Sequence, residues 1–267
     1  MQIVKGDPSY SLFLRVLLTV VIPIVLIFLA LSTTTILLLR QPVLALDLYD
    51  NFEGLPYTIG DNQTSPNGKW FNIYNGFGET GTVIVTPPTT TDTDNNNNNT
   101  VFYEKPKTST RPNETHAALT LTTQIYEDVD LQLKVKTNEQ LRQNSTPNPW
   151  EVAWIMWRFQ DDWHHYYLIF KPNGVELGKK QNENQEEEQI FLYTADEPKL
   201  KINEWNTWLI KMSGNHIEIW LKTADGSWQS VVDYHDNKPI VGPGNIGLYT
   251  EDAYVQFDDV YISSRSS

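Results

Sequence analysis

Cysteine is absent from the 267-residue chain, which excludes disulfide bonds, thiol catalysis and cysteine-ligated metals. Basic residues are scarce, with 20 Lys and Arg against 33 Asp and Glu, so the formal net charge is −13. A chain of this charge repels phosphate backbones, and we expect no nucleic-acid partner. The sequence also has no H-E-x-x-H, G-x-S-x-G or G-x-x-x-x-G-K-[ST] motif, so zinc-peptidase, serine-hydrolase and nucleotide chemistry have no support.

A long apolar run occupies residues 16–39, where 24 consecutive residues carry no charge. A membrane-spanning helix needs about 20 such residues, so we predict a transmembrane signal-anchor helix here. Lys5 and Arg15 precede it, and the positive-inside rule therefore places residues 1–15 in the cytoplasm and the C-terminal domain outside the cell. The expected protein is a single-pass protein of the cell membrane, with the membrane itself as one partner.

A cleaved signal peptide is the alternative interpretation of the same run. Val43, Leu44 and Ala45 resemble a small-residue cleavage site, and cleavage there would give a secreted protein. The apolar core of a signal peptide usually has about 7–15 residues. Because the run is longer than that, we favour the uncleaved anchor.

Helical periodicity is absent after residue 46, and the remaining chain shows short segments rich in β-branched and aromatic residues. The segment HIEIWLK alternates strictly, so that Ile217, Ile219 and Leu221 point to one face. Polar turn sequences separate such segments at the spacing typical of a sandwich. The sequence therefore predicts an all-β, antiparallel β-sandwich over residues 47–263.

Two features of the polar segments indicate surface exposure. Residues 86–100 contain Thr, Pro, Asp and Asn but no apolar residue, so we predict a disordered loop that interrupts the sandwich. The sequence N-x-[ST], the acceptor signal for N-glycosylation, occurs in polar stretches at four positions: Asn62, Asn98, Asn113 and Asn144. Glycans at these positions would fit an extracellular glycoprotein.

Four motifs follow one another in a familiar order: YDNFEG, FQDDWHHYYLIFKPNGVELGK, NEWNTWLIKMSGNHIEIWLK and GNIGLYTEDAYVQFDDVYIS. This order resembles the concanavalin A-like lectin/glucanase superfamily, nearest to the jelly-roll domains related to 3-keto-disaccharide hydrolases and laminarinase-like domains. The resemblance implies a concanavalin A-like jelly roll, which the predicted membrane helix precedes. Such sandwiches include enzymes, lectins and adhesion modules, so the resemblance does not specify an activity.

The carboxylate pattern argues against glucanase chemistry. Retaining glucanases of the superfamily that the chain resembles carry E-x-D-x-x-E or E-x-D-x-E on one strand, which places alternate carboxylates on one face. Here the nearest match is EDVD, in which only Asp128 and Asp130 share a face. We therefore expect a protein that is not an enzyme.

The stretch DDWHH offers the alternative, a glycoside hydrolase of the 3-keto-disaccharide type. Asp161, Asp162 and His165 would then lie near the chemistry, since a histidine beside carboxylates can transfer protons. The competing interpretation is structural: DDWHH is the turn before a buried strand that begins with Tyr166 and Tyr167.

Nine tryptophans indicate a possible sugar-binding surface, because aromatic rings stack on sugars while nearby polar groups bind hydroxyls. On AWIMWRF, residues 154, 156 and 158 share one face of the expected strand, and residues 155, 157 and 159 share the other. The candidates for a concave carbohydrate-binding face are Trp154, Arg158, Trp163, His165 and Trp220. The alternative is that these aromatic side chains fill a wide core.

These observations lead to three functional hypotheses. The first is a membrane-anchored, lectin-like module that binds a polysaccharide or glycan without cleaving it. The second is the glycoside hydrolase described above. The third is a structural or adhesive cell-envelope protein.

The resemblance to laminarinase-like domains also implies a structural Ca²⁺ ion where the first and last strands meet. The implied ligands are Asp258, either Asp50 or Glu53, and backbone carbonyls. Calcium binds about 6–8 oxygen ligands, which carboxylates, carbonyls and water can supply. Alternatively, Asp258 and Asp259 are only exposed residues of an outer strand.

Overall fold

The computed structural model describes residues 47–85, 99–182 and 189–265. The predicted cytoplasmic segment 1–15, the predicted membrane helix 16–39 and Asn98 lie outside these ranges. Within the described ranges, no helix is long and apolar enough to span a bilayer.

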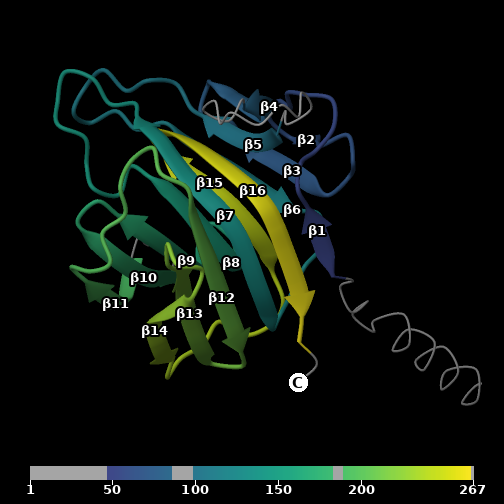
Figure 1. The fold of residues 1–267 in the computed structure, drawn as a ribbon, viewed down its shortest axis with the longest axis vertical. Helices are drawn as coiled ribbons and strands as arrows, with labels where there is room; N and C mark the ends of the chain where they lie inside the picture. The colour runs from purple at the N-terminus through teal and green to yellow at the C-terminus, as the bar shows by residue number, and fades with distance from the viewer. Residues whose placement is uncertain (1–46, 86–98, 183–188, 266–267) are drawn as a thin grey trace, which may run out of the picture. The chain divides into compact units, whose positions relative to one another are not determined.

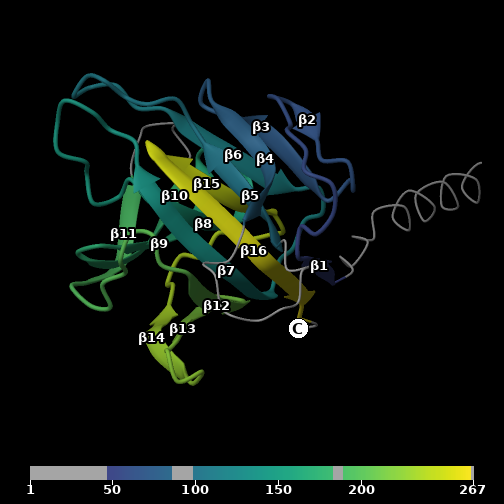
Figure 2. The same ribbon diagram turned by 45° about the horizontal axis from the view of Figure 1, so that its top comes forward.

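The described residues form two eight-stranded sheets in which all paired strands are antiparallel (Figures 1 and 2). Sheet A has the order β14 (Trp228–His235), β13 (His216–Lys222), β12 (Asn206–Ser213), β7 (Val129–Gln140), β16 (Ala253–Ser264), β5 (Asn99–Lys105) and β4 (Glu79–Val85), and β1 (Leu48–Asp50) also pairs with β16. Sheet B has the order β11 (Gln189–Ala195), β10 (Gly174–Gln181), β9 (His164–Lys171), β8 (Ala153–Asp161), β15 (Asn245–Glu251), β6 (Ala117–Thr122), β3 (Trp70–Tyr74) and β2 (Gln63–Thr64). The predicted all-β antiparallel sandwich is confirmed.

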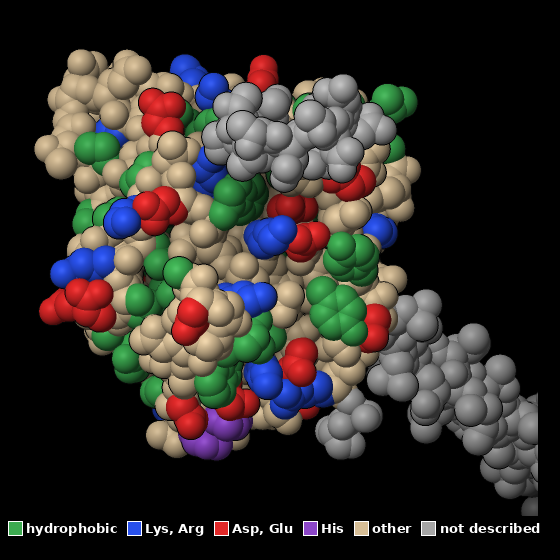
Figure 3. All heavy atoms as spheres, in the orientation of Figure 1, with side chains coloured by type: hydrophobic (Ala, Val, Ile, Leu, Met, Phe, Trp, Pro, Cys, Tyr) green, Lys and Arg blue, Asp and Glu red, His purple; other side chains and the backbone are tan. Residues whose placement is uncertain are grey.

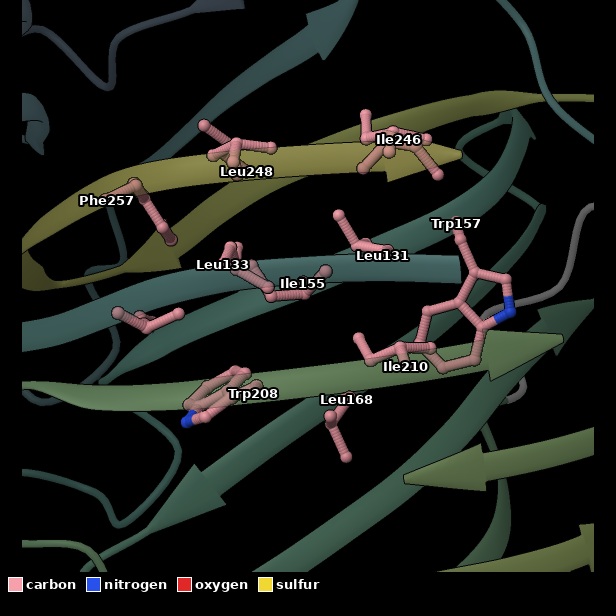
Figure 4. Close-up of a cluster of buried hydrophobic side chains, with 14 of the residues drawn as sticks. Leu131, Leu133, Ile155, Trp157, Leu168, Trp208, Ile210, Ile246, Leu248 and Phe257 are labelled. Atoms are coloured by element: carbon pink, nitrogen blue, oxygen red, sulfur yellow. The ribbon is translucent and has the colours of Figure 1, made fainter. Parts of the chain in front are cut away.

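The main hydrophobic core lies between the two sheets (Figure 4). Alternate residues of the strands face it, for example Leu131 and Leu133 on β7 and Ile155 on β8. Trp157 is fully buried, and its indole Nε1 lies 2.9 Å from the Met212 sulfur. A buried ring of this size removes about 150–250 Å² from water, so such side chains dominate the stability of the sandwich.

A second apolar cluster covers the other face of sheet B. It includes Trp154 and Met156 from β8 and Tyr249 from β15. β8 is therefore buried on both faces, which explains its nearly continuous apolar sequence. This second cluster forms the floor of the candidate site described below.

Two predicted loops are shorter than the sequence suggested. Asn99 and Thr100, expected in the 86–100 loop, begin β5 and pair with Val85 and Ile84 of β4. The rest of that loop lies outside the described residues. In DDWHH, only residues 162 and 163 form the turn, because both histidines already belong to β9.

Strand irregularities change which side chains face the core at two positions. Arg158 on β8 and Asp259 on β16 have positive φ angles of 46° and 47°, and the pairing register shifts at both. Strict alternation along the strand would place Val260 on the same face as Asp258. Instead Val260 is buried in the main core, because a bulge inserts one residue and so reverses the faces that follow.

Candidate functional site

A groove on the outer face of sheet B is the strongest candidate for a functional site. It consists of two adjoining hollows of about 310 and 420 Å³, which share Trp154, Gln189 and Glu251 in their walls. We call this surface the sheet B groove. The first hollow is lined mainly by side chains of β8, β9 and β15, and the second extends toward β10 and β11.

Aromatic rings form the floor and the rim of the sheet B groove. Trp154 is only 7% exposed, and its ring centroid lies 5.1 Å from that of Tyr167 and 5.5 Å from that of Tyr249. Its indole Nε1 donates a hydrogen bond to the Trp150 carbonyl, which fixes the ring. Trp150 and Phe191 are 44% and 59% exposed at the second hollow, so their faces are open to a ligand.

Two glutamates lie in the groove walls in different electrostatic settings. The Tyr249 hydroxyl donates a 2.6 Å hydrogen bond to Glu251, and burial raises the pKa of the Glu251 carboxyl. Glu176 accepts hydrogen bonds from the Tyr167 hydroxyl at 3.1 Å and from the Lys171 ammonium at 2.6 Å. Burial therefore favours the protonated form of Glu251, whereas the Glu176 carboxylate forms an ion pair with Lys171.

His165 lies in the first hollow and is 5% exposed. Its ring stacks on Phe159 at a centroid distance of 5.2 Å, and burial lowers the pKa of His165 to about 4. The imidazole is therefore neutral at pH 7. Its Nδ1 lies 3.2 Å from the Asp161 carbonyl oxygen. When Nδ1 carries the proton and donates to that oxygen, Nε2 is left as an acceptor.

The neighbouring residues of the β8–β9 turn have separate roles. The Asp161 carboxylate accepts hydrogen bonds from the Trp163 backbone N–H at 2.8 Å and lies 2.9 Å from His164 Nδ1, so it organises the turn. Asp162 and Trp163 line the first hollow, and the Lys180 ammonium lies 5.6 Å from the Trp163 ring centroid. Of the alternative catalytic residues, Asp162 and His165 thus reach the groove.

Arg158 does not belong to the predicted binding face. Its backbone bulge turns the guanidinium away from the groove. The guanidinium instead pairs with Asp128 at 2.9 Å and donates a hydrogen bond to the Ile240 carbonyl at 2.6 Å. Phe159 takes its place on the outer cluster. A Cβ atom at Gly244 would lie 2.4 Å from the Arg158 carbonyl carbon, so this bulge requires glycine opposite it.

Trp220 is also outside the groove. Its neighbours Ile219 and Leu221 on β13 face the main core, so Trp220 lies on the outer face of sheet A. The expectation that it is not a core residue agrees with its partial exposure. The grouping of Trp220 with Trp154 does not hold, because the two residues lie on different sheets and on opposite outer faces.

Several residues of the sheet B groove were not among the predicted site residues. Trp150, Glu176, Phe191, Tyr249 and Glu251 come from four separate stretches of the chain. Placing them in the groove requires knowledge of which strands are adjacent in sheet B.

The three residues implied as calcium ligands do not form one set. Asp50 pairs with Val260 and faces the core, where its carboxylate accepts hydrogen bonds from Trp70 Nε1 at 2.8 Å and Asn67 Nδ2 at 2.9 Å. Asp258 pairs with Lys134 on the outer face of the same sheet. A calcium site that combines Asp50 with Asp258 therefore does not fit this arrangement.

The carboxylates of Glu53 and Asp258 instead accept hydrogen bonds from other residues of the protein. The Thr100 backbone N–H donates to Glu53 at 3.2 Å, and Asn99 Nδ2 donates to Asp258 at 3.2 Å. The Lys134 ammonium lies 3.9 Å from Asp258, and it supplies positive charge where the ion was expected.

Three predicted glycosylation positions, Asn62, Asn113 and Asn144, are exposed. Their side chains are accessible to a modifying enzyme, and glycosylation at these positions stays a prediction. Asn98, the fourth position, lies outside the described residues.

Comparison with known proteins identifies the family. Residues 61–263 match the model of the 3-keto-alpha-glucoside-1,2-lyase-like domain. The chain belongs to this family. The predicted relation to the 3-keto-disaccharide hydrolase domains and their concanavalin A-like jelly roll is thereby confirmed. No curated protein sequence matches the chain.

Solved structures that resemble the chain do so at low sequence identity. The exoplasmic/lumenal domain of VIP36 in its Ca²⁺/Man2-bound form superposes with a TM-score of 0.51 at 8% identity, over 83% of this chain and 88% of that chain. The Ca²⁺-bound form of the same VIP36 domain superposes with a TM-score of 0.50 at 8% identity, over 79% of this chain and 90% of that chain. The carbohydrate-binding module CBM66 from Bacillus subtilis has a TM-score of 0.46 at 16% identity, over 61% of this chain and 86% of that chain.

Proposed function

We propose that this protein binds a carbohydrate in the sheet B groove as a lectin-like module. The observation that carries the proposal is the pair of open aromatic faces, Trp150 and Phe191, beside the buried Trp154. Aromatic faces stack on the apolar C–H faces of sugar rings, and a few polar groups on such a wall fix the orientation of a ligand. Membership in a family named for a glucoside-cleaving enzyme supports the same ligand class.

The polar groups of the sheet B groove fit a neutral polysaccharide or glycan. Glu176, Gln189 and Asn173 line the second hollow and offer acceptors and donors to hydroxyl groups. Glu251 lies where the two hollows meet, so a chain of two or more sugar units would contact it from either side. The net charge of −13 disfavours a polyanionic sugar.

The test is a binding measurement with variants of the two open rings. Trp150→Ala and Phe191→Ala should each weaken glycan binding by about 30-fold, since a central aromatic contact contributes about 2 kcal/mol or more. Glycan-array screening followed by titration calorimetry measures the loss. Both side chains are substantially exposed, so the melting temperature should stay nearly unchanged.

Two matched controls lie on the outer face of sheet A. Trp220→Ala removes a tryptophan outside the groove, and Tyr49→Ala removes an aromatic residue with 53% exposure against 59% for Phe191. Neither should change glycan binding. Equal losses in the controls, or full binding in both groove variants, would show that the groove does not hold the sugar.

A second candidate function is cleavage of a 3-keto-glucoside, favoured by His165 and Glu251. The neutral His165 Nε2 can accept the proton at C2, which the neighbouring ketone makes acidic. The C2–H electron pair forms a C1=C2 double bond as the C1–O bond breaks, and Glu251, whose pKa is raised by burial, donates a proton to the departing oxygen when its carboxyl is protonated. The base and the acid both line the first hollow.

Sugar release from the bound glycans and their 3-keto derivatives distinguishes these functions. A cleaving enzyme loses at least about 100-fold in rate in Glu251→Gln and His165→Gln, in line with the usual contribution of a general acid or base. A lectin binds without release in the parent protein. Neither binding nor release would favour a structural or adhesive cell-envelope protein.

We further propose that residues 16–39 anchor the sandwich on the outside of the cell membrane. The uncharged run and the preceding basic residues support this orientation. Protease added to intact cells should digest the sandwich, and full protection of residues 47–267 would reverse the orientation.

A further inference from the structure

Two histidines and an aspartate meet on the outer face of sheet A. His216 on β13 and His235 on β14 are cross-strand partners, and Asp233 precedes His235 by two residues on the same face. Ile217, which follows His216, and Val232, which precedes Asp233, are buried in the main core, and Tyr234 between Asp233 and His235 packs against it, so the backbone beneath the three side chains is well anchored. In Figure 3 histidine and acidic side chains gather at the lower edge, over β13 and β14 of Figure 1.

The three side chains already lie close to a metal-binding geometry. His216 Nε2 is 2.8 Å from an Asp233 oxygen, and the two imidazole rings are 4.2 Å apart and 8° from parallel. One possible ligand atom from each residue lies within 4.8 Å of the others. A tetrahedral ion with bonds of about 2.0–2.2 Å holds its ligand atoms about 3.3–3.6 Å apart. Metal binding requires the side chains, which are partly or fully exposed, to rotate so that the nitrogens of the two parallel rings turn toward one ion.

We propose that His216, Asp233 and His235 bind a divalent transition-metal ion, with Zn²⁺ as the probe of first choice. Imidazole nitrogens suit zinc, copper and nickel, whereas calcium and magnesium prefer oxygen ligands alone. Three protein ligands leave a fourth tetrahedral position for water or for an external group. The site lies on the other sheet from the sheet B groove, so it does not depend on the proposed carbohydrate binding.

The surrounding charges are compatible with a bound cation. Glu218 is the cross-strand partner of Asp233 and lies on the same outer face, where it adds a second negative charge. Lys211 on β12 is the partner of Glu218 and partly balances it. β14 is an edge strand of sheet A. An ion bound by residues of both β13 and β14 would therefore stabilise the pairing of this edge strand with its neighbour.

Calorimetric titration of Zn²⁺ into the full-length protein tests the proposal. The protein must lack a polyhistidine tag, and the buffer must not coordinate zinc. We expect one saturable site per chain. His235→Ala and Asp233→Asn should each raise the Kd at least about tenfold, because even loss of a residue that only supports a metal ligand costs about 10–100-fold in affinity.

His164→Ala is the matched control. The His164 side chain is 31% exposed and lies 2.9 Å from Asp161, compared with 33% and 2.8 Å for His216 and Asp233. Its substitution should leave the Kd unchanged. Saturating zinc should also raise the melting temperature of the parent and of His164→Ala but not of His235→Ala. Absence of saturable binding, an unchanged Kd in both site variants, or an equal loss in His164→Ala would overturn the proposal.

Discussion

Replacing Arg142 with methionine is expected to lower the free energy of unfolding by about 3–5 kcal/mol, the usual cost of leaving buried charges without their partner. The Arg142 side chain is 3% exposed, and its guanidinium lies 2.5 Å from Glu151 and 2.7 Å from Asp252. It also donates to the backbone carbonyls of Arg111 and Glu114. Methionine fills a similar volume but removes the guanidinium that pairs with the two buried carboxylates.

Urea denaturation of the Arg142→Met variant measures this loss. Arg111→Met is the matched control, because its side chain is 78% exposed and its ion pair with Glu114 is 3.7 Å long. The control should change stability by less than about 0.5 kcal/mol. A decrease of less than about 1 kcal/mol in the free energy of unfolding of Arg142→Met would contradict the prediction. It would mean that water or rearranged donors stabilise the two carboxylates in place of Arg142.

Replacing Glu104 with glutamine is expected to stabilise the protein at neutral pH. Glu104 lies on β5 with 0% exposure, and its carboxylate oxygens make no hydrogen bond of good geometry with the described residues; the Thr120 hydroxyl is a weak partner whose effect on the pKa is smaller than that of burial. The buried Thr80 hydroxyl on the paired position of β4 also lacks a partner there. Burial raises the pKa of Glu104 well above its ordinary value of 4.5.

The sign of the pH dependence follows from this raised pKa. The folded protein keeps a proton that the unfolded chain releases above about pH 4.5. The contribution of Glu104 to stability is therefore fully present below that pH. It falls by about 1.4 kcal/mol per pH unit until the folded-state pKa is passed. Glutamine has nearly the same shape and no proton to lose, so its advantage should grow from pH 4 to pH 7.

Urea denaturation of the parent and of Glu104→Gln at several pH values tests this prediction. Glu139→Gln, at an exposed position of β7, should show no such pH-dependent gain. A Glu104→Gln variant that is less stable than the parent at pH 7, or equally different from it at every pH, would contradict the prediction.

The sequence predicted the sandwich because alternation is a local property of each strand. In HIEIWLK, Ile217 and Ile219 face the core as expected. Local alternation fails where an extra residue is inserted, and the bulge at Arg158 exchanged the faces of Arg158 and Phe159. No composition signal marked this bulge, since the glycine that permits it, Gly244, lies far along the chain.

The residues of the candidate site were harder to predict from the sequence than the fold was. Alternation showed that Trp220 points away from the core, but it does not show to which sheet a strand belongs. The sheet B groove assembles Trp150, Trp154, Phe191 and Glu251 through strand order, which is a long-range property. Trp163 and His165 were found because they are neighbours in one hairpin.

The two-sided burial of β8 has a consequence for how such a protein can change during evolution. Ile155 and Trp157 maintain the interior, while Trp154 and Met156, their immediate neighbours in sequence, belong to the groove floor. Selection can therefore act on every second residue of one strand for ligand choice without disturbing the packing that the remaining residues provide. Alternate residues of one strand can thus be conserved for the core or varied for ligand binding independently of each other.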